Sequence, residues 1–142
     1  MKEPLASPGS DGSTPSDIEY TAGEVYLEVR VSGDFRLERF KRQIETILQT
    51  AKDRGLGKIL VDVTRMVRFE SLNTTDRFEM SSHAARLAGT SVAIAMLGKP
   101  VQLDRERFGE RVAQNRGLNV RVFVDEAAAV AWLTAPDAEP KA

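Results

Sequence analysis

The sequence is poor in the residues that most often carry catalytic chemistry. Among its 142 residues there is no cysteine and only one histidine. The absence of cysteine excludes disulfides, zinc fingers, iron–sulfur ligation and thiol nucleophiles, and it is typical of a reducing compartment, so we expect a cytoplasmic protein. One histidine excludes sites built from several imidazoles. These absences predict no metal centre, no cofactor and no enzymatic activity.

Long apolar runs and aromatic residues are also scarce. No apolar run approaches the roughly 18 residues that a membrane helix needs, so no transmembrane segment is expected. Aromatic residues make up 6% of the chain, and none of them forms an RNA-stacking motif, so nucleic-acid binding is not expected. A hydrophobic fraction of 42% at this length is sufficient for one core, which predicts a single domain.

The near-neutral charge balance hides an asymmetry along the chain. The formal net charge is -1, but the acids gather at the two ends. Between Val25 and Val124 there are 18 basic and 12 acidic residues, a net charge of +6. This body could attract an anionic partner. The plainer interpretation is that arginine and glutamate alternate on solvated helix faces, because no block of like charge exceeds two residues.

Both ends of the chain differ in composition from the middle. Residues 1–17 are rich in Ser, Pro, Gly and Asp and have hardly any apolar side chain, so folding them would cost entropy without burial. We therefore expect disordered tails at 1–17 and 135–142, with one domain at 18–134. The first segment has no apolar core and no cleavage-site pattern, so it is not a secretory signal.

Strand and helix patterns alternate through the middle of the chain. Alternating apolar residues predict a hairpin of strands 18–20 and 25–31, and helical spacing predicts a helix from Leu37 to about Gly55 with Asp34 as its N-cap. The remaining expected elements are strands 58–63, 91–97 and 119–124 and helices 72–88, 103–115 and 126–133. The order β-β-α-β-α-β-α-β-α predicts an α/β fold with a mostly parallel sheet and an antiparallel N-terminal edge hairpin.

Individual polar residues carry little evidence of chemistry. The segment 55–58 (GLGK) lies after a helix and before a strand, which is the wrong context for a phosphate-binding loop. His83 adjoins two serines on a predicted helix, where neighbours point about 100° apart, so we interpret it as a surface residue. Asp62 interrupts an apolar strand; it is either a catalytic or metal-binding carboxylate or, as we favour, an acceptor of hydrogen bonds from the following loop.

Several segments, in order and at suitable spacing, resemble one known family. The matching segments are 31–35 (VSGDF), 58–63 (KILVDV), 115–117 (NRG) and 123–127 (FVDEA), followed by Ala131, Trp132 and Leu133. Together they resemble the STAS domain, also called the SpoIIAA-like fold, and most of all the bacterial STAS/SEC14-like proteins. The resemblance covers 18–133 and implies a non-enzymatic regulatory or protein-binding role similar to that of the anti-sigma-factor antagonists.

The phosphorylation motif of those antagonists is only partly retained. Their second helix begins at Asp-Ser-Ser-Gly, and the corresponding residues here are Glu70, Ser71, Leu72 and Asn73. Leu72 stands where the family's phosphorylated serine lies. The resemblance therefore implies a degenerate motif, in which Ser71 is the remaining hydroxyl that a kinase could modify.

Two functions from different classes follow from this resemblance. The first is binding of a protein partner, such as a kinase-like or anti-sigma-like regulator, through the loop Thr64–Thr75 and the start of the second helix. The second is binding of an apolar, lipid-like small molecule between helices and sheet, although 116 folded residues leave little core to hollow out. The candidate partner-binding residues are Arg65, Arg68, Glu70, Ser71, Asn73, Thr74, Thr75 and Arg77.

Overall fold

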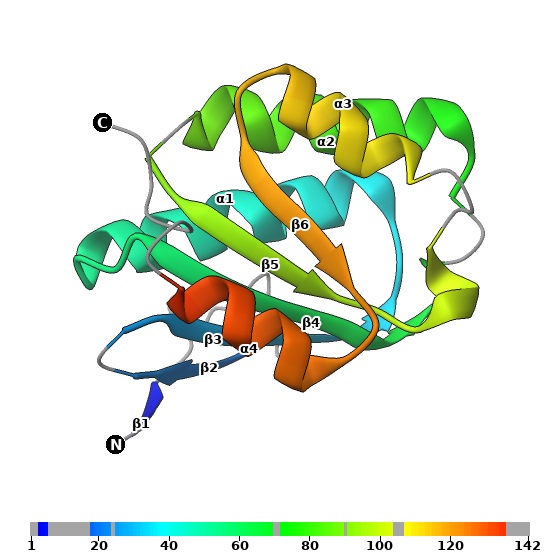
Figure 1. Ribbon diagram of the computed structural model, residues 1–142. Helices are drawn as coiled ribbons and strands as arrows, with labels where there is room; N and C mark the ends of the chain where they lie inside the picture. Colours follow the sequence, from blue (N-terminus) through cyan, green and yellow to red (C-terminus); the bar gives the residue numbers. More distant parts are fainter. Residues whose placement is uncertain are drawn as a thin grey trace.

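A computed structural model describes residues 3–5, 18–23, 25–69, 72–89, 91–103 and 107–135 (Figure 1). The elements, in chain order, are β1 (Glu3–Leu5), β2 (Ile18–Ala22), β3 (Leu27–Asp34), α1 (Leu37–Asp53), β4 (Lys58–Val67), α2 (Thr74–Ala88), β5 (Ala93–Leu97), the 3-10 turn η2 (Pro100–Gln102), α3 (Phe108–Asn115), β6 (Asn119–Phe123) and α4 (Glu126–Thr134). In the described part of the chain no helix is long and apolar enough to cross a membrane.

The strands form one mixed sheet in the order β1-β2-β3-β4-β5-β6. The pairs β1–β2 and β2–β3 are antiparallel, and the pairs from β3 to β6 are parallel. The predicted α/β class, the alternation of strands and helices and the antiparallel N-terminal hairpin are confirmed.

The strand β1 differs from the predicted disordered tail. Its three residues pair with residues 20–22 of β2. Strand pairing uses backbone N–H and C=O groups, so it does not require the apolar side chains that this segment lacks. Residues 6–17 and 136–142 lie outside the described residues, and the predicted tails and the boundaries at 18–134 stay predictions there.

Helices cover the two faces of the sheet unequally. Figure 1 shows α4 in front of the sheet and α1 behind it, with α2 and α3 side by side along the top of the view. Residues of α1, α2 and α3 share one cluster, and residues of α4 belong to another. The sequence pattern predicts one core that contains Phe40, Ile44, Ile47, Leu60, Ile94 and Phe123. That prediction is wrong, because Leu60 and Phe123 belong to a smaller cluster under α4, and the other four belong to the main cluster under α1 to α3. Successive strand residues point to opposite faces, so one strand supplies both clusters.

Two local predictions around β3 and β4 need correction. The strand β4 continues through Val67 rather than ending at Val63, because its parallel partner β3 also continues, with Asp34 opposite Val67. Asp34 is consequently the last residue of a strand and not the N-cap of α1, whose N-cap is Arg36 without a side-chain hydrogen bond. Residues 64–67 of the predicted loop at 64–75 are therefore strand.

The buried face of α2 is narrower than the sequence pattern indicates. Met80, Ala85 and Ala88 are buried as expected, but Phe78 and Leu87 are 41% and 50% exposed. The guanidinium carbon of Arg116 lies 5.0 Å from the centre of the Phe78 ring, so this ring is partly covered by a cation rather than by the core.

Tyr20 on β2 provides a pH-dependent test of the packing under α1. Burial raises the pKa of the Tyr20 hydroxyl above 10.0, and an interaction with the Thr50 side chain lowers it by less. The unfolded chain therefore loses this proton at a lower pH than the folded chain, and stability should fall as pH rises above about 10. We expect Tyr20→Phe to remove part of that loss in urea unfolding at pH 8 and pH 11. An unchanged difference between the two pH values would contradict it.

The main core is tested by truncating one residue of α1. Ile47 is buried in the cluster under α1 to α3, so Ile47→Ala should lower the free energy of unfolding by about 2–5 kcal/mol. The exposed Arg42 on the same helix is the control, and Arg42→Ala should change stability by less than about 0.5 kcal/mol. Equal effects of the two substitutions in denaturant titrations would show that the buried face of α1 is assigned wrongly.

Candidate functional site

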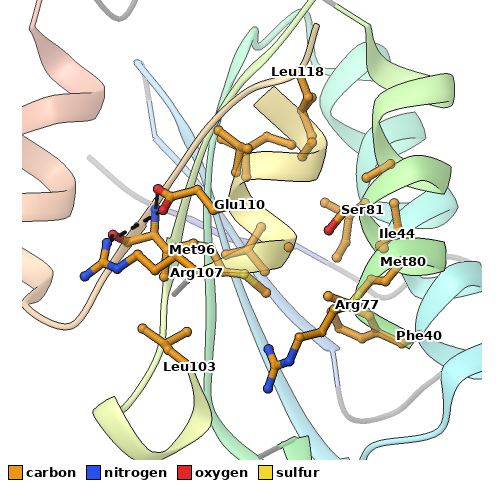
Figure 2. A pocket seen from close by; sticks show the side chains of 18 of the residues that line it. Phe40, Ile44, Arg77, Met80, Ser81, Met96, Leu103, Arg107, Glu110 and Leu118 are labelled. Carbon is orange, nitrogen blue, oxygen red and sulfur yellow. Dashed lines mark hydrogen bonds and ion pairs between the residues drawn. The ribbon is translucent and has the colours of Figure 1, made fainter. Parts of the chain in front are cut away.

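The main core contains a partly open cavity of about 120 Å³ between α1, α2, α3 and the strands β4 to β6. Figure 2 shows side chains of the helices and of the sheet converging on it. Its apolar walls are formed by Phe40, Ile44, Ile47, Leu48, Val61, Phe69, Met80, Ala84, Ile94, Met96, Leu103, Gly109, Ala113, Leu118, Val120 and Val122. The cavity lies on the face of the sheet opposite α4.

Small residues on α2 and α3 explain why this space is not filled. The two helices approach closely at Gly109, where an added Cβ atom would lie 3.1 Å from the Ser81 hydroxyl oxygen. Ala84 and Ala113 line the same cavity with one methyl group each. A close-packed core would place larger side chains at such positions. The helix contact is therefore tight at one point, and space remains beside it.

Two polar side chains of α2 line the cavity from inside the fold. Arg77 is 8% exposed and Ser81 is also buried. The Arg77 Nη2 atom donates a hydrogen bond of 3.4 Å to the carbonyl oxygen of Gln102. In Figure 2 the Arg77 side chain extends from α2 along the lower side of the cavity, toward Leu103. A guanidinium group is thus held at the wall of a mainly apolar space.

Gln102 fixes the segment that Arg77 contacts. Its side chain is 2% exposed, and its Nε2 atom donates to the carbonyl oxygens of Val63 and Met66, at 2.8 and 3.2 Å. Its Oε1 atom accepts from the backbone N–H of Lys99 at 2.8 Å. These bonds connect η2 to the end of β4. The predicted start of the next helix at 103 is wrong. Residues Pro100–Gln102 form the 3-10 turn that Gln102 holds against β4, and α3 begins at Phe108.

Arg107 and Glu110 line the cavity but are engaged with the edge strand β6. The backbone N–H of Val122 donates to Glu110 Oε2 at 2.8 Å, and Arg107 Nη1 donates to the Val122 carbonyl oxygen at 2.8 Å. Gln114 Nε2 donates to the carbonyl oxygen of Val120. Figure 2 shows Arg107 and Glu110 turned toward each other and away from Arg77. One face of α3 thus satisfies backbone groups that an edge strand would otherwise expose.

The predicted partner-binding residues are divided by the structure. Arg65, Arg68, Asn73, Thr74 and Thr75 are exposed near the end of β4 and the start of α2. Glu70 and Ser71, the candidate phosphorylation site, lie outside the described residues. Arg77 does not belong to this exposed surface, because the helix turns its side chain into the cavity.

Arg68, after β4, and Asn73, before α2, both make specific side-chain contacts. Arg68 has a φ of 66°, in the left-handed region, and its Nη2 atom lies 2.6 Å from Asp34 Oδ2. The side chain of Asn73 caps α2 by accepting a hydrogen bond of 2.8 Å from the N–H of Asp76. Val67 beside Arg68 is 53% exposed. The region therefore presents an apolar and basic surface at the carboxyl end of β4.

Two other residues considered from the sequence have structural partners. Asp62 Oδ1 accepts hydrogen bonds from the N–H and the hydroxyl of Thr64, at 2.8 and 2.6 Å, which confirms the favoured structural interpretation. His83 lies at the α1–α2 contact, with its Nε2 atom 2.9 Å from Glu45 Oε2. Within the described ranges, no three His, Cys, Asp or Glu residues are grouped so that they could hold a metal ion.

The resemblance implies a ligand site between helices and sheet, but the residues that line the cavity are not predicted from the sequence. Periodicity identifies which residues of α1 and of the strands point inward, but not that the inward residues fail to fill the space. The sequence feature that could indicate the cavity is a set of small residues at inward positions of two adjacent helices, namely Ser81, Ala84, Gly109 and Ala113. Such residues are equally typical of close helix packing, so the pattern alone is ambiguous.

A comparison with protein families gives one match. The family described as SpoIIAA-like matches residues 26–134, which is most of the chain and includes all the elements that line the cavity. A comparison with curated proteins gives no match.

The role of Glu110 at the β6 edge can be tested by substitution. Glu110→Ala removes the acceptor for the Val122 N–H and the ion-pair partner of Arg107 and should lower stability by about 1–3 kcal/mol. Arg111→Ala on the same helix changes an exposed side chain and should alter stability by less than about 0.5 kcal/mol. Thermal and urea unfolding would measure both variants. Equal stabilities would indicate that water replaces Glu110 at this edge without loss.

Proposed function

The chain belongs to the SpoIIAA-like family, and we propose that this STAS-type regulatory module works by binding a small apolar molecule in the cavity under α1, α2 and α3. The cavity is the observation that carries the proposal. Its wall is mostly aliphatic and aromatic, and it occupies the centre of the larger core. The proposed role is binding and not catalysis.

The size of the cavity supports a ligand of about one ring or a short chain. A buried apolar space of about 150 Å³ is sufficient to hold benzene. The cavity here, of about 120 Å³, is of similar size and partly open, so its apolar wall lacks the packing contacts of a filled core. A small molecule that fills it without displacing side chains would supply those contacts and stabilise the folded state. Long-chain lipids would need the walls to move apart.

The polar groups on the wall are consistent with binding. Arg107 and Glu110 are engaged with β6, as described above, and Ser81 packs against Gly109. Nucleophilic catalysis would need a base in hydrogen-bonding reach of the serine. The polar groups therefore serve better to orient a ligand than to transform it.

Filling the cavity should abolish binding. With 1-hexanol as the probe, we expect the melting temperature of the parent protein to rise with probe concentration, because a ligand that binds only the folded state stabilises it. Ala84→Leu places a larger side chain at the cavity wall and should remove this rise. Ala131→Leu makes the same change on an exposed position of α4 and should retain it.

Two results would contradict this function. One is the absence of any stabilisation of the parent protein by 1-hexanol, measured also by calorimetric titration. The other is an equal stabilisation of parent and Ala84→Leu, which would place the probe elsewhere. Native mass spectrometry of freshly purified protein gives an independent measurement, since a carrier should retain a small molecule.

A second candidate function is recognition of a protein partner by the exposed surface at the carboxyl end of β4. The specific observation in its favour is the exposure of Val67 beside Arg65 and Arg68, next to the first turn of α2. Apolar and arginine side chains together are typical of protein interfaces. The candidate residues Asn73, Thr74 and Thr75 are exposed at the start of α2. Glu70 and Ser71 precede them in the sequence, and a phosphate on Ser71 would change the charge of this segment.

The partner surface is tested by reversing its charge. Arg65→Glu combined with Arg68→Glu should abolish capture of a partner that depends on this surface, whereas Arg54→Glu, at an exposed turn after α1, should not. Quantitative mass spectrometry of cross-linked complexes would measure both variants against the parent. Partners recovered in equal amounts by all three proteins would exclude this surface.

A further inference from the structure

We infer that the ligand of the cavity is an uncharged, ring-sized molecule with one hydroxyl or carbonyl oxygen, which forms a hydrogen bond with the Ser81 hydroxyl while the apolar part fills the remaining space. This inference rests on the proposed function, because it assigns a chemical class to the occupant of the same cavity. It follows from the state of the Ser81 hydroxyl, from the missing side chain at Gly109 and from the partners of the charged side chains in the wall.

The hydroxyl group of Ser81 lies at the cavity wall and has no hydrogen-bond partner among the residues that the structure describes. Hydroxyl groups elsewhere in the helices donate to the carbonyl oxygen four residues earlier, as Thr46 and Thr50 of α1 do. The Ser81 side chain is 7% exposed, and Figure 2 shows it on the side of α2 that faces the cavity. A buried hydroxyl without a partner is unfavourable, so an acceptor that enters the cavity would satisfy it.

The residues around Ser81 leave its oxygen atom accessible from the cavity. A Cβ atom at Gly109 of α3 would lie only 3.1 Å from Ser81 Oγ, so any larger residue there would press against the oxygen and cover it. Ala84, one helical turn further along α2, adds only a methyl group to the wall. A hydroxyl group can donate one hydrogen bond and accept two. A ligand hydroxyl could therefore donate or accept here, and a ligand carbonyl could accept.

The charged side chains of the wall already have partners within the protein. Arg107 Nη1 lies 3.8 Å from Glu110 Oε1, and both side chains also bond to the backbone of Val122. Arg77 donates to the carbonyl oxygen of Gln102 and has a further interaction. An ionised ligand would lose its hydration in this mainly apolar space, where the charged groups are engaged elsewhere. The polar group of the ligand is therefore uncharged.

The rest of the wall suits a compact apolar group. The rings of Phe40 and Phe69 meet edge to face, with their centres 5.8 Å apart, and both line the cavity. Met80 of α2 and Met96 of β5 add two flexible thioether side chains. Aromatic and thioether groups are polarisable and adapt well to a ring. One oxygen near Ser81 and a ring beside these four residues would use the space that the fold leaves open.

The inference is tested with phenol and toluene, two rings of similar size that carry a hydroxyl and a methyl group respectively. Ser81→Ala removes the proposed partner of the phenol hydroxyl. We expect this variant to bind phenol about 3- to 10-fold more weakly than the parent protein does, and to bind toluene within about 2-fold of the parent, because toluene forms no hydrogen bond. Calorimetric titration measures the four affinities.

Ser82→Ala is the matched control for this substitution. Ser82 adjoins Ser81 on α2, its buried hydroxyl also has no partner in the described part of the chain, and it is not among the residues that line the cavity. This variant should bind phenol and toluene as the parent protein does. A loss of phenol affinity equal to that of Ser81→Ala would show that the effect comes from α2 as a whole and would overturn the inference.

Ser81→Thr provides a second test that does not depend on the folding of Ser81→Ala. It retains a hydroxyl group at the same position, so its ratio of phenol to toluene affinity should equal that of the parent protein, even if the added methyl group lowers both affinities. A ratio that falls as far as in Ser81→Ala would contradict the proposed hydrogen bond.

A charged probe tests the uncharged state of the ligand. Benzoate, which is ionised at neutral pH, should bind the parent protein at least about 10-fold more weakly than phenol, because its carboxylate would be buried without a free counter-charge. Benzoate affinity equal to or higher than that of phenol would overturn this part of the inference.

The outcomes separate this inference from the function on which it rests. If Ser81→Ala weakens phenol and toluene equally, or weakens neither, the hydrogen bond to Ser81 is wrong and the cavity remains a site for purely apolar molecules. If neither ring binds the parent protein, the inference is also wrong, and the proposed function fails with it only if 1-hexanol does not stabilise the parent protein.

Discussion

The side chain of Gln102 connects the segments on which the candidate site depends. It joins the end of β4 to the turn η2 through two backbone carbonyl groups and one backbone N–H group, and the backbone carbonyl oxygen of Gln102 accepts a hydrogen bond from Arg77 of α2. Buried amide groups are costly unless their hydrogen bonds are satisfied, so this network has one favourable arrangement. It places η2 and the start of α3 against the sheet, and with them the lower wall of the cavity.

The distribution of helices decides on which face a ligand can be held. The single helix α4 lies over β4, β5 and β6, where Ala93, Ala95 and Ala129 allow close packing. The opposite face is covered by three helices whose contacts with each other are also close, as at Gly109 and Ser81. Three helices that must pack both with one another and with the sheet cannot fill every gap with small side chains. The cavity is the result, and it lies in the cluster that also supplies most of the core.

The residues of β3, α1 and α2 show which buried positions the sequence predicts correctly and which it does not. The alternation in β3 and the spacing of Phe40, Ile47 and Ala51 in α1 predict buried faces that the structure confirms. The sequence places Arg65, Arg68 and Arg77 on either side of Ser71 and so predicts one binding surface for all three, yet the Arg77 side chain is buried and the other two are exposed. The error arises because adjacency along the chain gives no direction, and one helical residue step rotates a side chain by about 100°. Phe78, beside it, turns outward for the same reason.

The sequence by itself determined the α/β class, the order of the elements from β2 onward and the membership of the SpoIIAA-like family, because hydrophobic period and short motifs are local properties of the chain. The tertiary structure alone decided that the core divides into two clusters, that Arg77 and Gln102 meet, and that a cavity remains beside them. These features depend on contacts between residues 25 to 39 positions apart in the chain, such as the hydrogen bonds of Gln102 with Arg77 and with Val63. Local patterns specify which residues turn inward, but the volume that they leave unfilled is set only when all the elements pack together.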